Sequence, residues 1–191
     1  MRQNIIEAAI SMFAEEGYDK TSIRRIADKI EYSPATIYLY YKDKDELLYD
    51  VQKVVFDQLF ATFRKEVTAT EPFDRLREIA YSYVDFGRRN PELYDLMFII
   101  RAPMNVIEEK ENWKNGDDCF DFLLNCLDDC IQQGLIRFDN KMLAAISVWG
   151  MMHGLVSLDV RCRLKVMQLQ PDDVSAVIRN TVDQYLYLIK K

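Results

Sequence analysis

The chain has 191 residues, of which 49% are hydrophobic and 29% are charged. This composition is typical of a globular protein and excludes a disordered or fibrous one. The 25 Lys and Arg residues are outnumbered by 31 Asp and Glu residues, which gives a formal net charge of -6. That charge excludes a protein that coats nucleic acid or anionic lipid without selectivity, although it is compatible with a small basic patch. Six Gly and five Pro are too few for a β-sandwich or barrel with many turns.

The first residues give no sign of secretion. Residues 1–4 lead directly into an amphipathic pattern, without the apolar core of a signal peptide. The longest uncharged stretch, residues 142–158, is shorter than the roughly 20 residues that a membrane span needs. We expect it to be a buried helix of a soluble protein, with no membrane contact. The four Cys residues are then most simply reduced thiols, and the protein is expected in the cytoplasm.

Three short helices are expected at the N-terminal end. Apolar residues recur at helical spacing over residues 5–13, and the pattern stops at Gly17, a good C-terminal cap. A second helix follows the cap residue Ser22. A third begins at Pro34, because a Ser cap followed by Pro is a strong start signal. This third helix is short and ends near residue 41.

Longer helices follow, and Asp43 is the expected N-cap of the first one. They are expected over residues 44–67, 72–90, 91–98, 117–133, 140–167 and 172–189, with a polar loop or ragged helix over 103–117. The sequence thus predicts an all-α protein of about nine helices without a strand. It divides into an N-terminal three-helix domain over residues 1–48 and a C-terminal helical bundle over residues 49–191.

The second and third expected helices are joined by a tight turn, and the third is too short to form a core element by itself. This spacing is typical of a helix-turn-helix, whose second helix enters the major groove of DNA. The residues that carry it read GYDKTSIRRIA over 17–27 and YSPATIYLYYKDKDEL over 32–47. Over residues 4–50 the chain resembles the TetR family of bacterial transcriptional regulators.

The resemblance implies a function. Members of the family are homodimers that bind near-palindromic DNA operators, and a small molecule that enters the C-terminal bundle releases them. We therefore expect residues 1–48 to bind DNA and residues 49–191 to bind a small hydrophobic ligand and to dimerise, as in a repressor. Two alternatives stay open: a helical interaction protein that has lost DNA binding, and a regulator that responds to redox state or metal through its thiols.

Hydroxyl and cationic side chains gather around the expected helix-turn-helix. Thr21 and Ser22 can donate hydroxyls to phosphate at a helix start, where the helix dipole favours anions, and Lys44 carries an ammonium suited to phosphate. Taken singly they would be ordinary cap and surface residues, but their spacing and the resemblance favour DNA contact. The expected DNA-binding residues are Thr21, Ser22, Arg24, Ser33, Pro34, Ala35, Thr36, Tyr38, Leu39, Tyr40 and Lys44.

The expected recognition helix is poor in side chains that read bases. Residues 33–41 contain no Arg, Lys, Asn or Gln, which form the bidentate hydrogen bonds to guanine and adenine. Direct readout would depend on hydroxyls, on phenols and on contact between Ala35 and thymine methyl groups. We hypothesise that the operator is richer in A·T than in G·C pairs, and that much of the binding specificity comes from DNA shape. Arg24 is then the most suitable reader of a guanine.

One position departs from the family pattern. Glu31 stands where the family usually has Gly, in the turn between the second and third helices. If that turn requires a left-handed backbone, Glu31 costs about 1–2 kcal/mol relative to Gly. The departure can shift the recognition helix slightly.

Small residues share one face of a later helix. Ser147, Gly150 and Gly154 are three and four residues apart, a spacing that allows another helix to approach closely. Together with Trp149 and His153 they resemble a TetR subgroup with a Trp–His–Gly signature. That resemblance implies that the last two long helices form a four-helix dimer interface. Close packing inside one subunit is the alternative.

Aromatic and methionine side chains could line a lipophilic pocket, although residues at helical spacing are often plain core. The expected ligand-binding residues are Tyr81, Tyr94, Met97, Phe98, Phe122, Trp149, Met152 and His153. Tyr83 and Phe86 belong to the same aromatic-rich stretch. His153 is the only histidine and fits a buried, hydrogen-bonded residue better than a metal ligand. Since no catalytic triad, phosphate loop or general-base pair is present, we expect no enzyme activity, no metal and no cofactor.

Cys119, Cys126 and Cys130 are spaced to share one helix face. Their simplest interpretation is as small apolar residues that face the core. A thiol sensor of redox state or of a soft metal is the alternative. It would require that face to be exposed, or Cys162 to lie alongside it.

Overall fold

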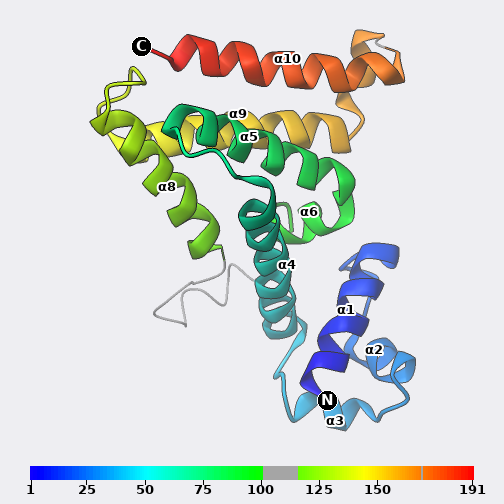
Figure 1. Cartoon of the computed structure of the whole chain (residues 1–191). Coiled ribbons are helices and arrows are strands. Elements are labelled where there is room, and N and C mark those ends of the chain that lie inside the picture. Colours follow the sequence, from blue (N-terminus) through cyan, green and yellow to red (C-terminus); the bar gives the residue numbers. More distant parts are fainter. Residues whose placement is uncertain (101–115, 169) are drawn as a thin grey trace. The chain divides into compact units, whose positions relative to one another are not determined.

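The structure is a computed structural model that describes residues 1–100, 116–168 and 170–191. The described residues form nine α-helices and one 3-10 helix, and they contain no strand (Figure 1). This confirms the predicted all-α fold. Most of the polar segment predicted over 103–117 lies outside the described residues.

The chain divides into two compact units, the first made of Met1–Gln58 and Asn90–Gly116 and the second of Leu59–Arg89 and Asp117–Lys191. A functional division between residues 1–48 and 49–191 stays a prediction.

The first unit holds the three short helices. It consists of α1 (Arg2–Glu16), α2 (Ile23–Lys29), α3 (Pro34–Tyr38), the first part of α4 (Lys44–Glu66) and α6 (Pro91–Phe98). One continuous apolar core joins them, and each helix contributes a fully buried side chain, such as Ile5, Ile26, Ile37, Leu47 and Leu96. Because short helices are only marginally stable alone, this shared core is what holds α3 in place.

The second unit is a helical bundle. It consists of the rest of α4, α5 (Pro72–Arg89), α8 (Asp117–Gln132), α9 (Lys141–Val160), the 3-10 helix η1 (Arg163–Met167) and α10 (Pro171–Ile189). Helix α5 packs against α8, α9 and α10. The turn after α8 is tied to the end of α10, since the backbone N–H of Arg137 donates to the carbonyl of Ile189 at 2.8 Å and that of Lys191 to the carbonyl of Leu135 at 3.0 Å.

Two predicted helix ends are wrong. Helix α3 ends at Tyr38 rather than near residue 41, and a turn carries the chain into α4. The helix predicted over 140–167 is interrupted, because α9 ends at Val160 and Cys162 adopts a left-handed backbone with φ of 55° before η1 begins. Neither Gly nor Pro marks that break, so periodicity alone extends the helix through it.

Helix α9 is not buried all round, contrary to the prediction for residues 142–158. Val148, Met152 and Val156 face the core, whereas Leu143 and Ile146 are exposed. By length and composition alone α9 could cross a membrane, but a third of its most apolar window is buried inside the bundle. One side of α9 therefore belongs to the core, and the other is an apolar surface.

Candidate nucleic-acid interface and effector site

The cap residues of the helix-turn-helix start its two helices. Ser22 is the N-cap of α2, and its hydroxyl oxygen accepts a hydrogen bond from the backbone N–H of Arg25 at 3.3 Å. Ser33 caps α3 in the same way by accepting from the N–H of Thr36 at 3.3 Å, with Pro34 in the first helical turn. A capping oxygen that accepts still carries its own hydroxyl hydrogen. Both serines are exposed. The hydroxyl of Ser22 can therefore also donate to a phosphate, whereas that of Ser33 lies 3.0 Å from the hydroxyl of Thr36 and shares a hydrogen bond with it.

Helix α3 has one buried side and one exposed side. Ile37 is completely buried and anchors the helix in the core, whereas Leu39 is 83% exposed and Tyr38 is 54% exposed. Tyr40 and Ala35 are also exposed. An apolar side chain as exposed as Leu39, flanked by two phenols, forms a surface that favours a partner. Four predicted recognition residues are therefore accessible: Ala35 and Tyr38 on α3, and Leu39 and Tyr40 just after it.

The turn between α2 and α3 has a left-handed residue at Glu31, with φ of 58°. The backbone N–H of Tyr32 donates to the carbonyl of Ala27 at 3.0 Å, and that of Glu31 donates to the carbonyl of Asp28 at 3.2 Å. These two bonds are the Schellman pattern, in which Gly usually occupies the left-handed position. The turn is thus closed normally, although Glu31 carries the conformational strain anticipated from the sequence.

Thr21 does not occupy the predicted position at the DNA surface. Its side chain is only 1% exposed. The hydroxyl donates to the carbonyl oxygens of Gly17, at 3.0 Å, and Met12, at 3.3 Å. A hydroxyl used in this way is not available to a phosphate, so Thr21 joins the end of α1 to the start of α2. We correct its role from phosphate donor to structural residue.

Lys44 is likewise engaged inside the domain. Its ammonium donates to the carbonyl oxygens of Tyr18, at 2.8 Å, and Thr21, at 3.0 Å, and lies 4.0 Å from the centre of the Tyr18 ring. Burial and a hydrogen bond to Asp45 raise the pKa of Tyr18, so the ring stays neutral beneath the cation. The predicted phosphate contact of the Lys44 side chain is therefore replaced by a contact that holds the loop before α2.

The three cations of α2 differ in their partners. Arg25 forms an ion pair with Glu16 and donates to the carbonyl of Lys20 at 3.1 Å, and Lys29 donates to the hydroxyl of Ser11 at 2.7 Å. Arg24 is exposed, and in the described part of the chain no hydrogen bond or ion pair engages its guanidinium. Arg24 is thus the cation of α2 best placed to contact DNA.

A cluster that the sequence did not reveal fixes the far end of the recognition segment. The hydroxyl of Tyr41 donates to the carboxylate of Asp50 at 2.8 Å, and Arg2 donates to the same carboxylate at 2.6 Å. Burial raises the pKa of Tyr41 to about 12. The cluster joins the residue just beyond α3 to α1 and α4. Arg2 lies 39 residues from Tyr41 and 48 from Asp50 along the chain, so no local sequence signal identifies the cluster.

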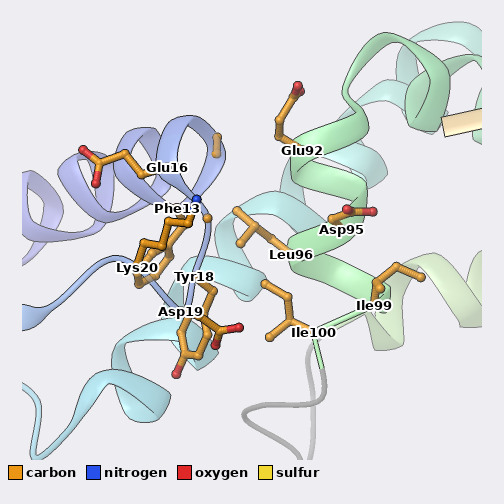
Figure 2. Close-up of a pocket in the computed structure, with 12 residues that line it drawn as sticks. Phe13, Glu16, Tyr18, Asp19, Lys20, Glu92, Asp95, Leu96, Ile99 and Ile100 are labelled. Carbon is orange, nitrogen blue, oxygen red and sulfur yellow. The ribbon is translucent and has the colours of Figure 1, made fainter. Parts of the chain in front are cut away.

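An acidic groove marks a face of the first unit that is unsuited to DNA. It has a volume of about 730 Å³ and lies between the end of α1, the loop after it and α6 (Figure 2). Carboxylates line both sides, with Glu16 and Asp19 on one and Glu92 and Asp95 on the other, against a single ammonium from Lys20. This excess of negative charge repels phosphates, so the groove is not expected to contact DNA.

The eight predicted ligand residues are divided between the two units. Three lie in the first unit, where Tyr94 and Met97 are buried and Phe98 packs against Tyr94 with ring centres 5.2 Å apart. The other five lie in the second unit and are Tyr81, Phe122, Trp149, Met152 and His153. Phe122 stacks on Phe63, Met152 is buried in the core, and Tyr81 donates a hydrogen bond to Asp183. Their role in ligand binding stays a prediction.

The second unit does contain one polar cluster among aromatic side chains. Tyr83 on α5 accepts a hydrogen bond from the indole N–H of Trp149 at 3.2 Å, and its hydroxyl lies 3.2 Å from Nδ1 of His153. Burial, with a smaller contribution from the charge of Arg161, lowers the pKa of His153. His153 is therefore hydrogen-bonded, as we expected, but only partly buried. Tyr83, which belongs to the aromatic-rich stretch noted in the sequence, thus connects Trp149 and His153.

The thiol-bearing face of α8 is buried. Cys119, Cys126 and Cys130 all belong to the core, and Cys162 is exposed, which confirms their interpretation as core residues. Among the described residues no group of three or more His, Cys, Asp or Glu side chains could hold a metal ion. A sensor built on an exposed Cys face is therefore not what the structure contains.

Comparison with known protein families covers most of the chain. Residues 5–51 match the family described as bacterial regulatory proteins, tetR family, and residues 76–185 match the tetracyclin repressor-like C-terminal domain. An HTH-type transcriptional regulator of Haemophilus influenzae, itself uncharacterized, is 29% identical over 116 residues, which cover 60% of this chain and 62% of that protein. The transcriptional repressor KstR2 of Mycolicibacterium smegmatis is 30% identical over 76 residues, 39% of this chain and 37% of that one. The chain thus spans only part of the length of these relatives.

Solved structures agree on the fold. The transcriptional regulator FadR of Bacillus subtilis, determined in complex with stearoyl-CoA, has a TM-score of 0.72 at 21% identity and covers 96% of each chain. The ketosteroid transcriptional regulator KstR2 of Mycobacterium tuberculosis has a TM-score of 0.67 at 19% identity over 100% of this chain and 95% of that one. With family matches over both its N-terminal and C-terminal parts, this chain belongs to the TetR family of bacterial transcriptional regulators.

Proposed function

We propose that the chain is a cytoplasmic, homodimeric repressor that binds a near-palindromic operator by inserting α3 into the major groove. The observation that carries the proposal is the accessible surface at the end of α3, where Tyr38 and the next residues, Leu39 and Tyr40, are exposed while Ile37 anchors the helix in the core. A helix-turn-helix presents its second helix to bases in this way. The rival interpretation, a protein that has lost DNA binding, rests on Glu31 alone, and the intact hydrogen bonds of its turn give it no support.

Operator selection tests the DNA-binding proposal. Random duplex DNA is enriched on the purified protein and sequenced, and each recovered site is then measured by gel shift with wild type and Tyr38→Ala. We expect paired half-sites that lean towards A·T, and a loss of binding in Tyr38→Ala without a change in circular dichroism. Where a half-site contains a guanine, Arg24→Ala should lose the preference for guanine at that position. Enrichment of no sequence would overturn the proposal, and a G·C-rich consensus unchanged by Arg24→Ala would overturn the readout.

The dimer is proposed to form through the exposed apolar side of α9, together with α10. Leu143, Ile146 and Leu158 are exposed there, and a Cβ added at Gly150 or Gly154 would meet no atom within 4 Å. Within the described residues nothing packs closely against these two glycines, which supports an interface with a partner over close packing inside one subunit. The partner helix would approach over them, and Tyr187 and Leu188 on α10 extend the exposed apolar surface.

Substitution of Gly150 tests whether the exposed apolar side of α9 is a dimer interface. Gly150→Leu has space in the subunit and gains helix propensity, so it should leave the isolated subunit folded. In a dimer it should block the approach of the partner helix, and light scattering should then report monomers and weaker operator binding. Asn125→Leu, at an exposed position on α8, is the matched control. A dimer that survives Gly150→Leu unchanged would refute this interface.

The effector is proposed to be a small hydrophobic molecule bound by the aromatic side chains of the bundle. The stearoyl-CoA in the complex of FadR and the designation of KstR2 as a ketosteroid regulator support a largely apolar ligand for a protein of this fold. Native mass spectrometry of the freshly purified chain, followed by solvent extraction, tests this. The extracted molecule, added back, should release the operator in a gel shift. The proposal would be contradicted if the purified protein carried no ligand and if neither acyl-CoA nor sterol released it from the operator.

A further inference from the structure

Leu39 is the most exposed of the large apolar side chains that the structure describes, at 83%. It follows α3 directly, and its backbone keeps right-handed helical angles, with φ of -71° and ψ of -20°. The backbone N–H of Tyr41 donates to the carbonyl of Ile37 at 3.1 Å, which is the four-residue spacing of an α-helical hydrogen bond. Leu39 therefore lies within a helical turn, and the direction of its side chain follows from its place on the helix.

Leu39 and Ala35 lie on the side of α3 opposite its buried anchor. Successive residues of a helix are rotated by about 100°, so the residues two before and two after Ile37 both point away from it. Ile37 is completely buried, whereas Ala35 and Leu39 are exposed, as this rotation requires. Thr36 and Tyr38 lie on the two flanks. Because residues four apart on a helix are neighbours, Ala35 and Leu39 form one apolar strip along the outer side of α3.

The major groove offers an apolar strip only one kind of partner. Guanine, adenine and cytosine present hydrogen-bonding groups there, and thymine alone adds a C5-methyl group. An apolar side chain placed on a polar base edge removes water from that edge without replacing its hydrogen bonds, which is unfavourable. Placed on a thymine methyl group, it buries apolar surface on both sides. A strip of this kind therefore favours thymine and disfavours a G·C pair.

We propose that Leu39 determines the base preference of each half-site by packing on the C5-methyl group of a thymine. The inference rests on the proposed insertion of α3 into the major groove, and it names the base that the helix recognises there. The Cβ atoms of residues four apart on a helix are about 5–6 Å from one another, and successive base pairs are about 3.4 Å apart. Leu39 and Ala35 can therefore contact neighbouring base pairs, with Leu39 supplying most of the apolar contact because its side chain is larger.

Replacement of thymine by deoxyuridine tests the contact directly. Deoxyuridine keeps the base pair and its hydrogen-bonding groups and lacks only the C5-methyl group. Operators recovered by selection on the wild type are synthesised with one symmetry-related pair of thymines replaced at a time, and affinities are measured by fluorescence anisotropy at fixed salt. One such pair should weaken wild-type binding about 15-fold, which is about 4-fold for each methyl group that leaves the contact. Leu39→Ala should bind that duplex and the parent operator with almost equal affinity.

Two further variants make the test specific. Val166→Ala removes an apolar side chain that is 80% exposed in η1, in the second unit, and should keep the full difference between thymine and deoxyuridine. Leu39→Gln introduces an amide that can form bidentate hydrogen bonds to adenine. A selection repeated with Leu39→Gln should therefore no longer recover thymine at the position that Leu39 contacts.

The outcomes separate this inference from the proposed function. If the wild type binds its selected operator but no deoxyuridine weakens the complex, or if Leu39→Ala keeps the full difference at every thymine, the inference is overturned and DNA binding by α3 stands. If selection on the wild type recovers no operator at all, the proposed function and this inference fail together.

Discussion

The ammonium of Lys44 donates a hydrogen bond of 3.0 Å to the backbone carbonyl of Thr21, the residue that precedes the N-cap of α2. A second bond, to the carbonyl of Tyr18, is 2.8 Å long. The first residue of α4 thus holds the loop that leads into the helix-turn-helix. Lys44, which the sequence suggests as a phosphate contact, thus fixes the loop before α2 through hydrogen bonds inside the domain.

Lys44→Met should therefore weaken the fold without removing a phosphate contact. The loss of hydrogen bonds to a charged group should lower the free energy of unfolding by about 1.5–3 kcal/mol, measured by urea denaturation at fixed protein concentration. The slope of log affinity against log salt should stay constant at a temperature where the variant is folded. Removal of a phosphate contact would instead reduce that slope by about 0.9 per contact, and such a reduction would show that Lys44 binds DNA directly.

Thr21→Val tests the second reassigned residue. The valine keeps the shape of the side chain but leaves the carbonyls of Gly17 and Met12 without the hydroxyl donor. The free energy of unfolding should fall by about 1–3 kcal/mol, and operator affinity below the unfolding transition should be unchanged. Ser22→Ala is the matched comparison, because its hydroxyl is exposed and caps α2, and it should lower both stability and affinity. An operator complex weakened by Thr21→Val as much as by Ser22→Ala would restore a direct role for Thr21.

Glu31→Gly should stabilise the protein. The left-handed backbone at Glu31 costs about 1–2 kcal/mol for a residue with a Cβ. Gly avoids this cost but loses more conformational entropy on folding, which offsets roughly 0.5–1 kcal/mol of the gain. The net gain should be up to about 1.5 kcal/mol, measured as a higher midpoint of thermal unfolding. Glu31→Ala keeps the Cβ and should show no such gain. If Ala stabilises as much as Gly, the effect comes from the charge of Glu31 and not from its backbone.

The features that sequence predicts here are local. Gly17 ends α1 and Ser33 caps α3 as expected, and the carboxylate of Asp43 accepts the N–H of Glu46 at 2.8 Å at the start of α4. Each of these signals involves residues within four positions of one another. Helix periodicity works for the same reason, so the all-α fold and most helix bounds follow from the sequence.

The features that sequence misses depend on distant contacts. Whether Thr21 and Lys44 face solvent is decided by loops and helices that pack together in the folded domain, and the same holds for the cluster of Tyr41, Asp50 and Arg2. Composition shows that α9 is apolar but not which side the bundle covers. The eight residues predicted for the ligand site are divided between the two compact units, a division that their spacing along the chain cannot reveal, and their role in ligand binding stays a prediction.

His153 should make stability depend on pH in a narrow window. Burial lowers its pKa below 6.5, so the folded protein keeps the imidazole neutral while the unfolded chain takes up a proton as the pH falls through about 6.5. The unfolded state then binds more protons than the folded state, and stability falls as the pH is lowered.

Because His153 is the only histidine, its contribution can be isolated. Between about pH 7.5 and 5.5, above the range where ordinary carboxylates titrate, the free energy of unfolding should fall in wild type and stay level in His153→Gln. Urea denaturation at fixed protein concentration gives both curves, and parallel curves would mean that His153 is as accessible to protons in the folded protein as in the unfolded chain.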